Sequence, residues 1–277
     1  MQQFVCLSGL PRSGSTILSA ILDQNPLIHA EGNSAVCQFM WDIYQAGTVH
    51  ALEQLKGNNR MGTMKDIIQQ VPHIYYKDIP ASKKIIVDKC RAWTIASNVE
   101  ILRTNIDPNI KIIVLERSVT AIMKSFMKLY KNNNWSDEYM HQILKAMLVP
   151  NGDPIMRSII GINMAKKENA LRPPAQQTFL FIQYDDLIAK PAETIERIYA
   201  FCGWEPFAHH FDKIVNAHPE NDAYYNLKGF HTIRPTLSKQ ENTIILPPDI
   251  LAKCQKIDNL MWGVPPQTPQ RMQKTEV

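Results

Sequence analysis

Residues 9–16, Gly-Leu-Pro-Arg-Ser-Gly-Ser-Thr, combine the residue types that bind phosphate or sulfate in proteins. They follow the apolar run 4–7 and precede a run whose apolar residues have helical spacing. A strand, a glycine-containing turn and a helix start direct backbone N–H groups and the positive end of the helix dipole at an anion. We therefore predict that a phosphate is held through the N–H and hydroxyl donors of Ser13, Gly14, Ser15 and Thr16.

The spacing from Gly9 to Gly14 and Thr16 is that of the phosphate loop (P-loop) of nucleotide triphosphatases, except that Ser15 replaces the usual lysine. That lysine supplies positive charge at the β- and γ-phosphates, so its replacement argues against an ordinary nucleotide triphosphatase. Positive charge comes earlier, from Arg12, whose planar guanidinium suits a phosphate or sulfate. A P-loop kinase acting on a small molecule remains an alternative.

Length and composition are those of a soluble globular protein. With 277 residues the chain can bury a sizeable core, and its net charge of +4 is too small to indicate a nucleic-acid partner. The five cysteines show no disulfide or zinc spacing, which is typical of reduced thiols. Neither a signal peptide nor an apolar run of the ~18–20 residues that span a membrane is present. We predict a cytoplasmic protein with no membrane span.

Four apolar runs have the length and composition of buried strands: residues 4–7, 84–88, 112–115 and 179–182. Polar residues come at the carboxyl ends of three of them: Lys89, Glu116-Arg117 and Gln183-Tyr184. Open α/β sheets bind their ligands at the carboxyl ends of strands, so these side chains are candidates for one site. Strands that alternate with helices predict a three-layer α/β fold with a mainly parallel central sheet.

The remaining segments are predicted to surround this sheet. Two helical insertions, residues 35–80 and 131–174, contain no nucleotide-binding pattern and should cover the mouth of the site and line an acceptor pocket. Residues 27–34 should return the chain to that mouth, and the part beyond residue 203 should be rich in loops. We predict a single domain over residues 1–263 and a disordered tail over 264–277, where prolines replace apolar residues.

Together with the loop, three later blocks resemble sulfotransferases that use 3′-phosphoadenosine 5′-phosphosulfate (PAPS), and the tyrosylprotein and bacterial branch most of all. They are Ile113-Val114-Leu115-Glu116-Arg117 with Ser125; Phe181 to Leu187 with Pro191 and Phe201-Cys202-Gly203-Trp204; and His231-Thr232-Ile233-Arg234-Pro235. The four ordered blocks cover most of the chain. The resemblance implies a P-loop NTPase-like sulfotransferase fold with helical cover insertions.

The resemblance also implies how the nucleotide is bound. Arg12 and the rest of the loop would bind the 5′-phosphosulfate, and Arg117 and Ser125 would clamp the 3′-phosphate. Tyr184 would lie beside the adenine or ribose, and Arg234 belongs to a basic loop that folds over the nucleotide. The co-substrate is then PAPS, and the product is 3′,5′-adenosine bisphosphate.

For catalysis, the resemblance implies in-line attack of an acceptor on sulfur, with Arg12 and Lys89 neutralising the charge on the leaving oxygen. No metal is expected, because these cations replace the magnesium of a kinase. In the tyrosylprotein branch the general base is a glutamate about twenty residues after the loop arginine. Glu31 lies nineteen residues after Arg12, although a gapless alignment puts Asn33 at the family position. We predict Glu31 as the base, with two rivals: His29 and Asp88.

The acceptor and the assembly stay open. The sequence is compatible with a hydroxyl or amine acceptor on a small molecule, a glycan, a lipid or a peptide, and it does not define the oligomeric state. A second alternative function is a catalytically idle nucleotide-binding module that keeps the same fold.

Overall fold

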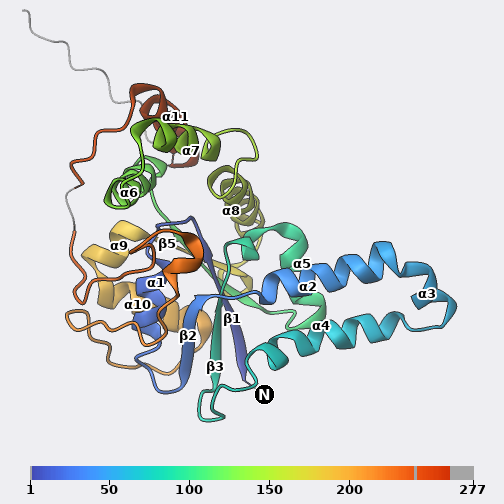
Figure 1. The fold of residues 1–277 in the computed structure, drawn as a ribbon. Coiled ribbons are helices and arrows are strands. Elements are labelled where there is room, and N and C mark those ends of the chain that lie inside the picture. The colour runs from blue at the N-terminus through green and yellow to red at the C-terminus, as the bar shows by residue number, and fades with distance from the viewer. Residues whose placement is uncertain (1, 240–241, 263–277) are drawn as a thin grey trace, which may run out of the picture.

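The computed structural model describes residues 2–239 and 242–262 as three layers around a central sheet (Figure 1). The sheet has five parallel strands in the order β2-β3-β1-β4-β5. They are β1 (Gln3–Gly9), β2 (Ile28–Asn33), β3 (Ile85–Lys89), β4 (Lys111–Glu116) and β5 (Phe179–Gln183). This architecture confirms the predicted three-layer α/β fold.

The described helices fall into three groups by position. The first group is α1 (Ser15–Leu22), α9 (Tyr184–Ala189) and α10 (Pro191–Cys202), which contact the strands, and α5 (Ala96–Asn105), which contacts helices of the other two groups. The first insertion forms α2 (Val36–Gln45), a π-helical turn (Ala46–His50), α3 (Leu52–Gly57) and α4 (Met61–Tyr75). The others are α6 (Val119–Asn132), α7 (Asp137–Met147), α8 (Ile155–Ala170) and α11 (Pro248–Trp262), with 3₁₀ turns at Arg91–Thr94, Pro174–Gln176 and Asp222–Tyr225.

The alternating side chains of β1 show how the layers pack. Val5 and Leu7 face one core, shared with the apolar faces of α1 and α10. Cys6 faces a larger core on the other side, which includes residues of α2, α5, α6 and α8. Successive strand residues point to opposite faces of a sheet, so continuous apolar runs are required where helices cover both faces.

The strand order reverses beside β1, which pairs with β3 on one side and with β4 on the other. From β1 the chain first adds β2 and β3 on one side, and then crosses to add β4 and β5. Ligands of open α/β sheets bind outside the carboxyl ends of the strands at such a reversal. The loop that follows Gly9 starts at this position.

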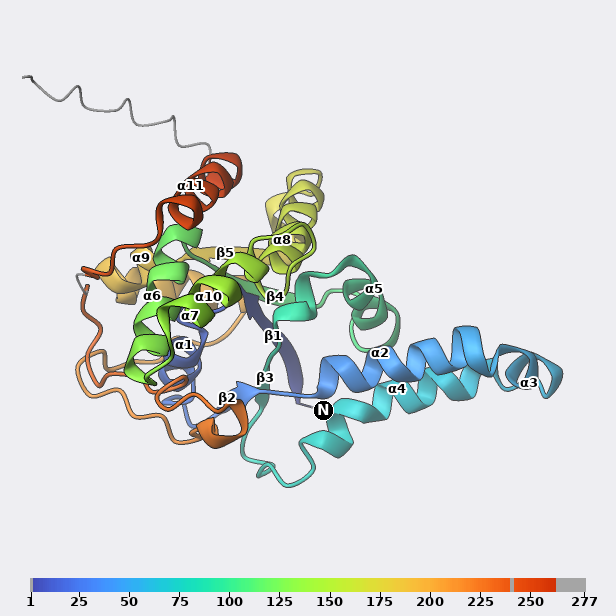
Figure 2. The same ribbon diagram turned by 45° about the horizontal axis from the view of Figure 1, so that its top comes forward.

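The first insertion forms an arm that projects from the sheet, with α2 and α4 side by side and α3 at the far end (Figures 1 and 2). The second insertion places α7 and α8 above the sheet near α6 and α5. The helical character predicted for both insertions is confirmed.

Two elements depart from the prediction. Residues 28–33 form the edge strand β2 instead of an irregular return segment; His29, Glu31 and Gly32 interrupt the apolar pattern that would have marked it. The region expected to be rich in loops contains α11, whose start coincides with Pro248. Proline is favoured at the first position of a helix, so the pair Pro247-Pro248 marks a helix start and not only a loop.

Among the residues that the structure describes, no helix has the length and apolarity needed to cross a bilayer. The tail predicted over residues 264–277 lies outside the described residues.

Candidate functional site

The loop at residues 10–14 follows the carboxyl end of β1 and leads directly into α1. Gly9 has a φ of 141°, and a Cβ at this position would overlap the carbonyl oxygen of Leu115 in β4. Gly14 has a φ of 94°, and a Cβ there would lie 2.8 Å from the ring of Tyr184. Only glycine both adopts such a positive φ readily and lacks a Cβ, which explains why glycines stand at positions 9 and 14.

Arg12 has a φ of 56° and extends its side chain toward α6. Its Nε donates to Ser125 Oγ at 3.2 Å, and its guanidinium also donates to the carbonyl oxygen of Phe230. Burial, followed by the nearby charge of Arg117, lowers the pKa of Arg12. The structure therefore brings together Arg12 and Ser125, which the sequence assigned to opposite ends of a nucleotide.

Arg117 follows β4 and lies on the other side of Arg12. It donates to the Arg12 carbonyl oxygen at 2.7 Å, and its guanidinium carbon lies 4.1 Å from the centre of the Tyr184 ring. Burial lowers its pKa. Within the described part of the chain, neither arginine forms an ion pair with a carboxylate. Two half-buried guanidiniums that make no such ion pair favour an anionic ligand.

Lys89 ends β3, and its side chain is 3% exposed. Its Nζ lies 3.4 Å from Thr16 Oγ1 and 3.0 Å from Glu220 Oε1. Burial lowers the pKa of Lys89, and the charge of Glu220 opposes that effect. The predicted catalytic lysine thus reaches the first turn of α1, beside the loop.

Glu220 belongs to the late segment, which we define as residues 205–238, and the sequence analysis did not identify it. Besides Lys89 it accepts from the backbone N–H and the side-chain amide of Asn33, at 3.2 and 3.3 Å. Tyr225 Oη donates to it at 3.3 Å. No local pattern marks Glu220, because its partners lie on strands far away in the sequence.

His231 and Asp222 form a second pair that the sequence analysis missed. Nδ1 of His231 lies 2.8 Å from Asp222 Oδ1, and the His231 backbone N–H also donates to that carboxylate. Nε2 of His231 points toward Glu220, with Oε2 at 3.4 Å. A carboxylate at one ring nitrogen orients an imidazole, and here the other nitrogen faces the second carboxylate, that of Glu220. The signal available in the sequence was the position of His231 in the block that contains Arg234.

The three candidates for the general base lie away from this pair. Glu31 is beside His29, with Oε2 3.2 Å from Nε2, and this neighbour lowers the Glu31 pKa. Asp88 is fully buried, and it accepts from Tyr76 Oη at 2.8 Å and from Trp93 Nε1 at 2.7 Å. Burial raises the pKa of Asp88.

A cavity of about 930 Å³ opens at the carboxyl ends of the strands. Its lining includes every predicted site residue except Ser13, Glu31 and the two rival bases His29 and Asp88. The Ser13 hydroxyl donates to the Leu10 carbonyl oxygen at 2.5 Å, so that side chain is turned away from the cavity. Seven cationic side chains and one carboxylate line it: Arg12, Lys89, Arg91, Arg117, Lys128, Arg157, Arg234 and Asp153. This imbalance suits a ligand with several negative charges.

Comparison with known families agrees with this geometry. The sequence model of the sulfotransferase family matches residues 5–209, from β1 through the start of the late segment. The chain belongs to the sulfotransferase family. A search of curated proteins found no match.

This sulfotransferase has the fold of several solved sulfotransferase structures. The sulfotransferase domain of the Synechococcus PCC 7002 olefin synthase is 18% identical with a TM-score of 0.54, over 94% of each chain. The sulfotransferase domain of the curacin biosynthetic pathway is 19% identical with a TM-score of 0.57, over 94% of this chain and 96% of that one. A sulfotransferase from Alicyclobacillus acidocaldarius is 10% identical with a TM-score of 0.51, over 94% and 95%.

Proposed function

We propose that this sulfotransferase moves the sulfuryl group of PAPS to a hydroxyl or amine acceptor. The observation that supports this most is the position of Lys89, whose Nζ lies 3.4 Å from the hydroxyl of Thr16. In P-loop nucleotide triphosphatases the corresponding hydroxyl binds Mg²⁺. Here an ammonium group lies beside it, and an ammonium can neutralise a leaving phosphate without a metal.

The sulfuryl donor, PAPS, would be held by the loop and by the two arginines that form no ion pair in the described part of the chain. The N–H groups at the start of α1 and the hydroxyls of Ser15 and Thr16 line the cavity where a 5′-phosphosulfate would bind. Arg117 and Ser125 are proposed to bind the 3′-phosphate. Arg12 contacts both of these residues, so it would lie between the 5′-phosphosulfate and the 3′-phosphate of the bound nucleotide. Tyr184 packs its ring against the Arg117 guanidinium and lines the cavity, so we place it beside the nucleoside.

In the proposed reaction, an acceptor oxygen or nitrogen attacks sulfur as the bond from sulfur to the bridging oxygen breaks. Arg12 and Lys89 stabilise the negative charge that develops on the departing 5′-phosphate. We assign the role of general base to Nε2 of His231, which would take the proton from the acceptor. His231 lines the cavity, and Asp222 fixes its orientation. Glu31 does not line the cavity. Its role as the general base stays a prediction, which the sulfate-transfer assay described below can test with Glu31→Gln.

The first experiment is a thermal shift of the purified protein with 3′,5′-adenosine bisphosphate, ADP, or ATP with Mg²⁺. A ligand that binds the native state raises the melting temperature. We expect stabilisation by the bisphosphate, its loss in Arg117→Ala, and its retention in the matched control Arg60→Ala, an exposed arginine outside the cavity. Stabilisation by ATP and Mg²⁺ alone would instead favour the kinase alternative.

The acceptor assay separates an enzyme from an idle module. With bisphosphate binding established, transfer of sulfate to any member of a panel of alcohols, phenols, sugars and amines supports the proposal. Binding without turnover on the whole panel would favour the nucleotide-binding module.

A further inference from the structure

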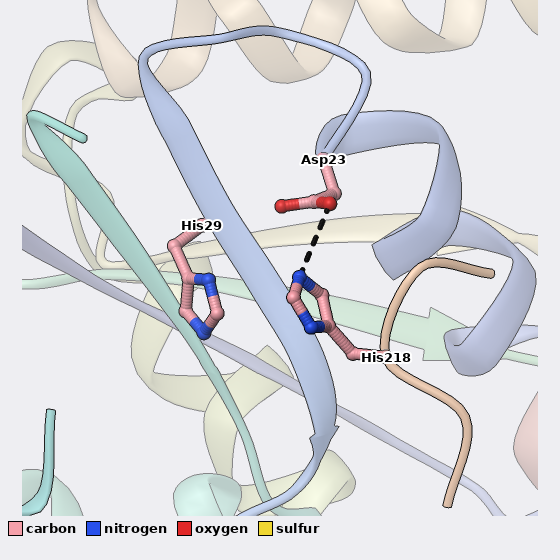
Figure 3. A group of neighbouring side chains, drawn as sticks. All are labelled: Asp23, His29 and His218. Atoms are coloured by element: carbon pink, nitrogen blue, oxygen red, sulfur yellow. Dashed lines mark ion pairs between the residues drawn. The ribbon is translucent and has the colours of Figure 1, made fainter. Parts of the chain in front are cut away.

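Three side chains with metal-ligating groups meet outside the cavity described above (Figure 3). Asp23 follows the last residue of α1, His29 lies in β2, and His218 belongs to the late segment. One ligand atom from each lies within 4.8 Å of the other two. Among residues 2–239 and 242–262, this is the one group of three or more His, Cys, Asp or Glu side chains with that geometry.

The contact between His218 and Asp23 is longer than a good hydrogen bond. Nε2 of His218 lies 3.4 Å from Asp23 Oδ2, whereas N–H···O bonds measure about 2.7–3.2 Å. Two ligands of a tetrahedral Zn²⁺, each at about 2.0–2.1 Å, lie about 3.4 Å apart. The observed separation therefore suits an ion between the two groups better than a direct bond.

His29 supplies the second, independent observation. Its side chain is 3% exposed, and its Nε2 faces Glu31 Oε2 at 3.2 Å, so Nδ1 is the ring nitrogen that would bind an ion. Histidines that bind a metal through one nitrogen typically offer the other to a carboxylate, and Glu31 is in position for that role.

The second oxygen of Asp23 is already held by neighbouring groups. Oδ1 accepts from the Ala30 backbone N–H at 3.2 Å, and Lys83 Nζ lies 3.5 Å from it. Lys83 is also fixed by the carbonyl oxygen of Ile28 at 2.5 Å. These contacts orient the carboxylate and leave Oδ2 facing His218.

We propose that Asp23, His29 and His218 bind a divalent transition ion such as Zn²⁺, with water as the fourth ligand. His218 is 39% exposed, which gives the ion access from solvent. The role is structural: the ion joins the end of α1 and the edge strand β2 to the late segment, two residues before Glu220. It thereby fixes the segment whose Glu220 contacts Lys89 and Asn33. This proposal does not depend on the donor or on the reaction.

The test is a calorimetric titration of the tag-free, chelator-treated full chain with Zn²⁺ at pH 7.5. We expect one equivalent to bind and the melting temperature to rise in parallel. Co²⁺ in the same site should give the visible absorption of a tetrahedral complex. The principal variant is His218→Ala, because this partly exposed side chain can be removed without opening the core; it should weaken binding by about 100-fold or more.

The matched control is His50→Ala, which removes a histidine from the arm and should leave Zn²⁺ binding unchanged. Asp23→Asn keeps the shape of the side chain and should weaken binding as His218→Ala does. Lack of saturable binding by the unmodified chain would overturn the proposal. Equal affinity in His218→Ala and in the unmodified chain would also overturn it.

Discussion

Asn33 donates both its backbone N–H and its side-chain amide to the carboxylate of Glu220, which lies 187 residues away in the sequence. Asn33 occupies the position at which the tyrosylprotein branch resembled by this chain has a glutamate. A carboxylate is thus present at that end of β2, but the late segment supplies it. Burial is the strongest single influence and acts to raise the Glu220 pKa, but the charge and hydrogen bond of Lys89, the charge of His231 and the Asn33 N–H together lower the net pKa.

Replacing Glu220 by glutamine should leave the Lys89 ammonium buried without a counter-charge. We expect a loss of about 3 kcal/mol in the free energy of unfolding at pH 7, measured by urea denaturation. Because the Glu220 pKa is lowered in the folded state, its contribution is present above the unfolded pKa of about 4.3 and disappears as the pH falls through the folded pKa.

The difference between wild type and Glu220→Gln should therefore shrink in acid. Glu193→Gln, which removes an exposed partner of Lys190, should change stability by less than about 0.5 kcal/mol at any of these pH values. A constant difference down to pH 3 would contradict the ion-pair explanation.

Gly14→Ala should disrupt the loop and the stacking of Arg117 on Tyr184. The added Cβ would lie 2.8 Å from the Tyr184 ring, at a φ that alanine rarely adopts. We expect a destabilisation of about 1–3 kcal/mol and a loss of stabilisation by the bisphosphate. Gly62→Ala is the control: it lies in α4 with open space around its Cα and should stabilise by about 0.5–1 kcal/mol. Intact nucleotide binding in Gly14→Ala would show that the loop tolerates the side chain.

Asp258 of α11 caps the start of α6, the helix that presents Ser125 to Arg12. Its carboxylate accepts four hydrogen bonds, from the backbone of Val119 and Thr120 and from the hydroxyls of Ser118 and Thr120. Loss of a helix cap costs about 0.5–2 kcal/mol, so Asp258→Ala should lower the melting temperature by about 2–6 °C. A calorimetric scan measures it. Asp249→Ala, on the exposed first turn of the same helix, should have a smaller effect.

His231→Asn keeps a donor for Asp222 and removes Nε2, so it tests proton transfer with little change in packing. We expect kcat to fall by about 10²-fold while bisphosphate affinity is retained. Glu31→Gln should have a smaller effect on kcat, because Glu31 does not line the cavity. The reverse pattern, a large loss in Glu31→Gln with normal turnover in His231→Asn, would return the role of base to Glu31.

The predictable part of this molecule follows from local sequence. The loop, Lys89 and Arg117 each lie at or just past the carboxyl end of a buried apolar run, and parallel strands bring these ends to one edge of the sheet. This rule needs no knowledge of distant contacts. It located Arg12, Lys89, Arg117 and Tyr184, all of which line the cavity.

The unpredicted part depends on the late segment, which has little regular structure. Glu220, Asp222 and His218 act with partners on β2, β3 and α1, and no periodicity specifies where an irregular segment will cross a sheet. The strand β2 was missed because it is short and lies at the edge, where polar residues are tolerated. Helix α11 was missed although Pro248 stands at its first position, where proline is favoured.

The hydrogen bond from Arg12 to the Phe230 carbonyl oxygen makes the late segment and the phosphate loop thermodynamically linked. A nucleotide that attracts the Arg12 guanidinium changes the free energy of holding the segment in place. By reciprocity, any ligand or substitution that secures the segment must change nucleotide affinity by the same factor. In the proposed reaction, release of the nucleotide product and the strength of this hydrogen bond would therefore be two parts of one equilibrium.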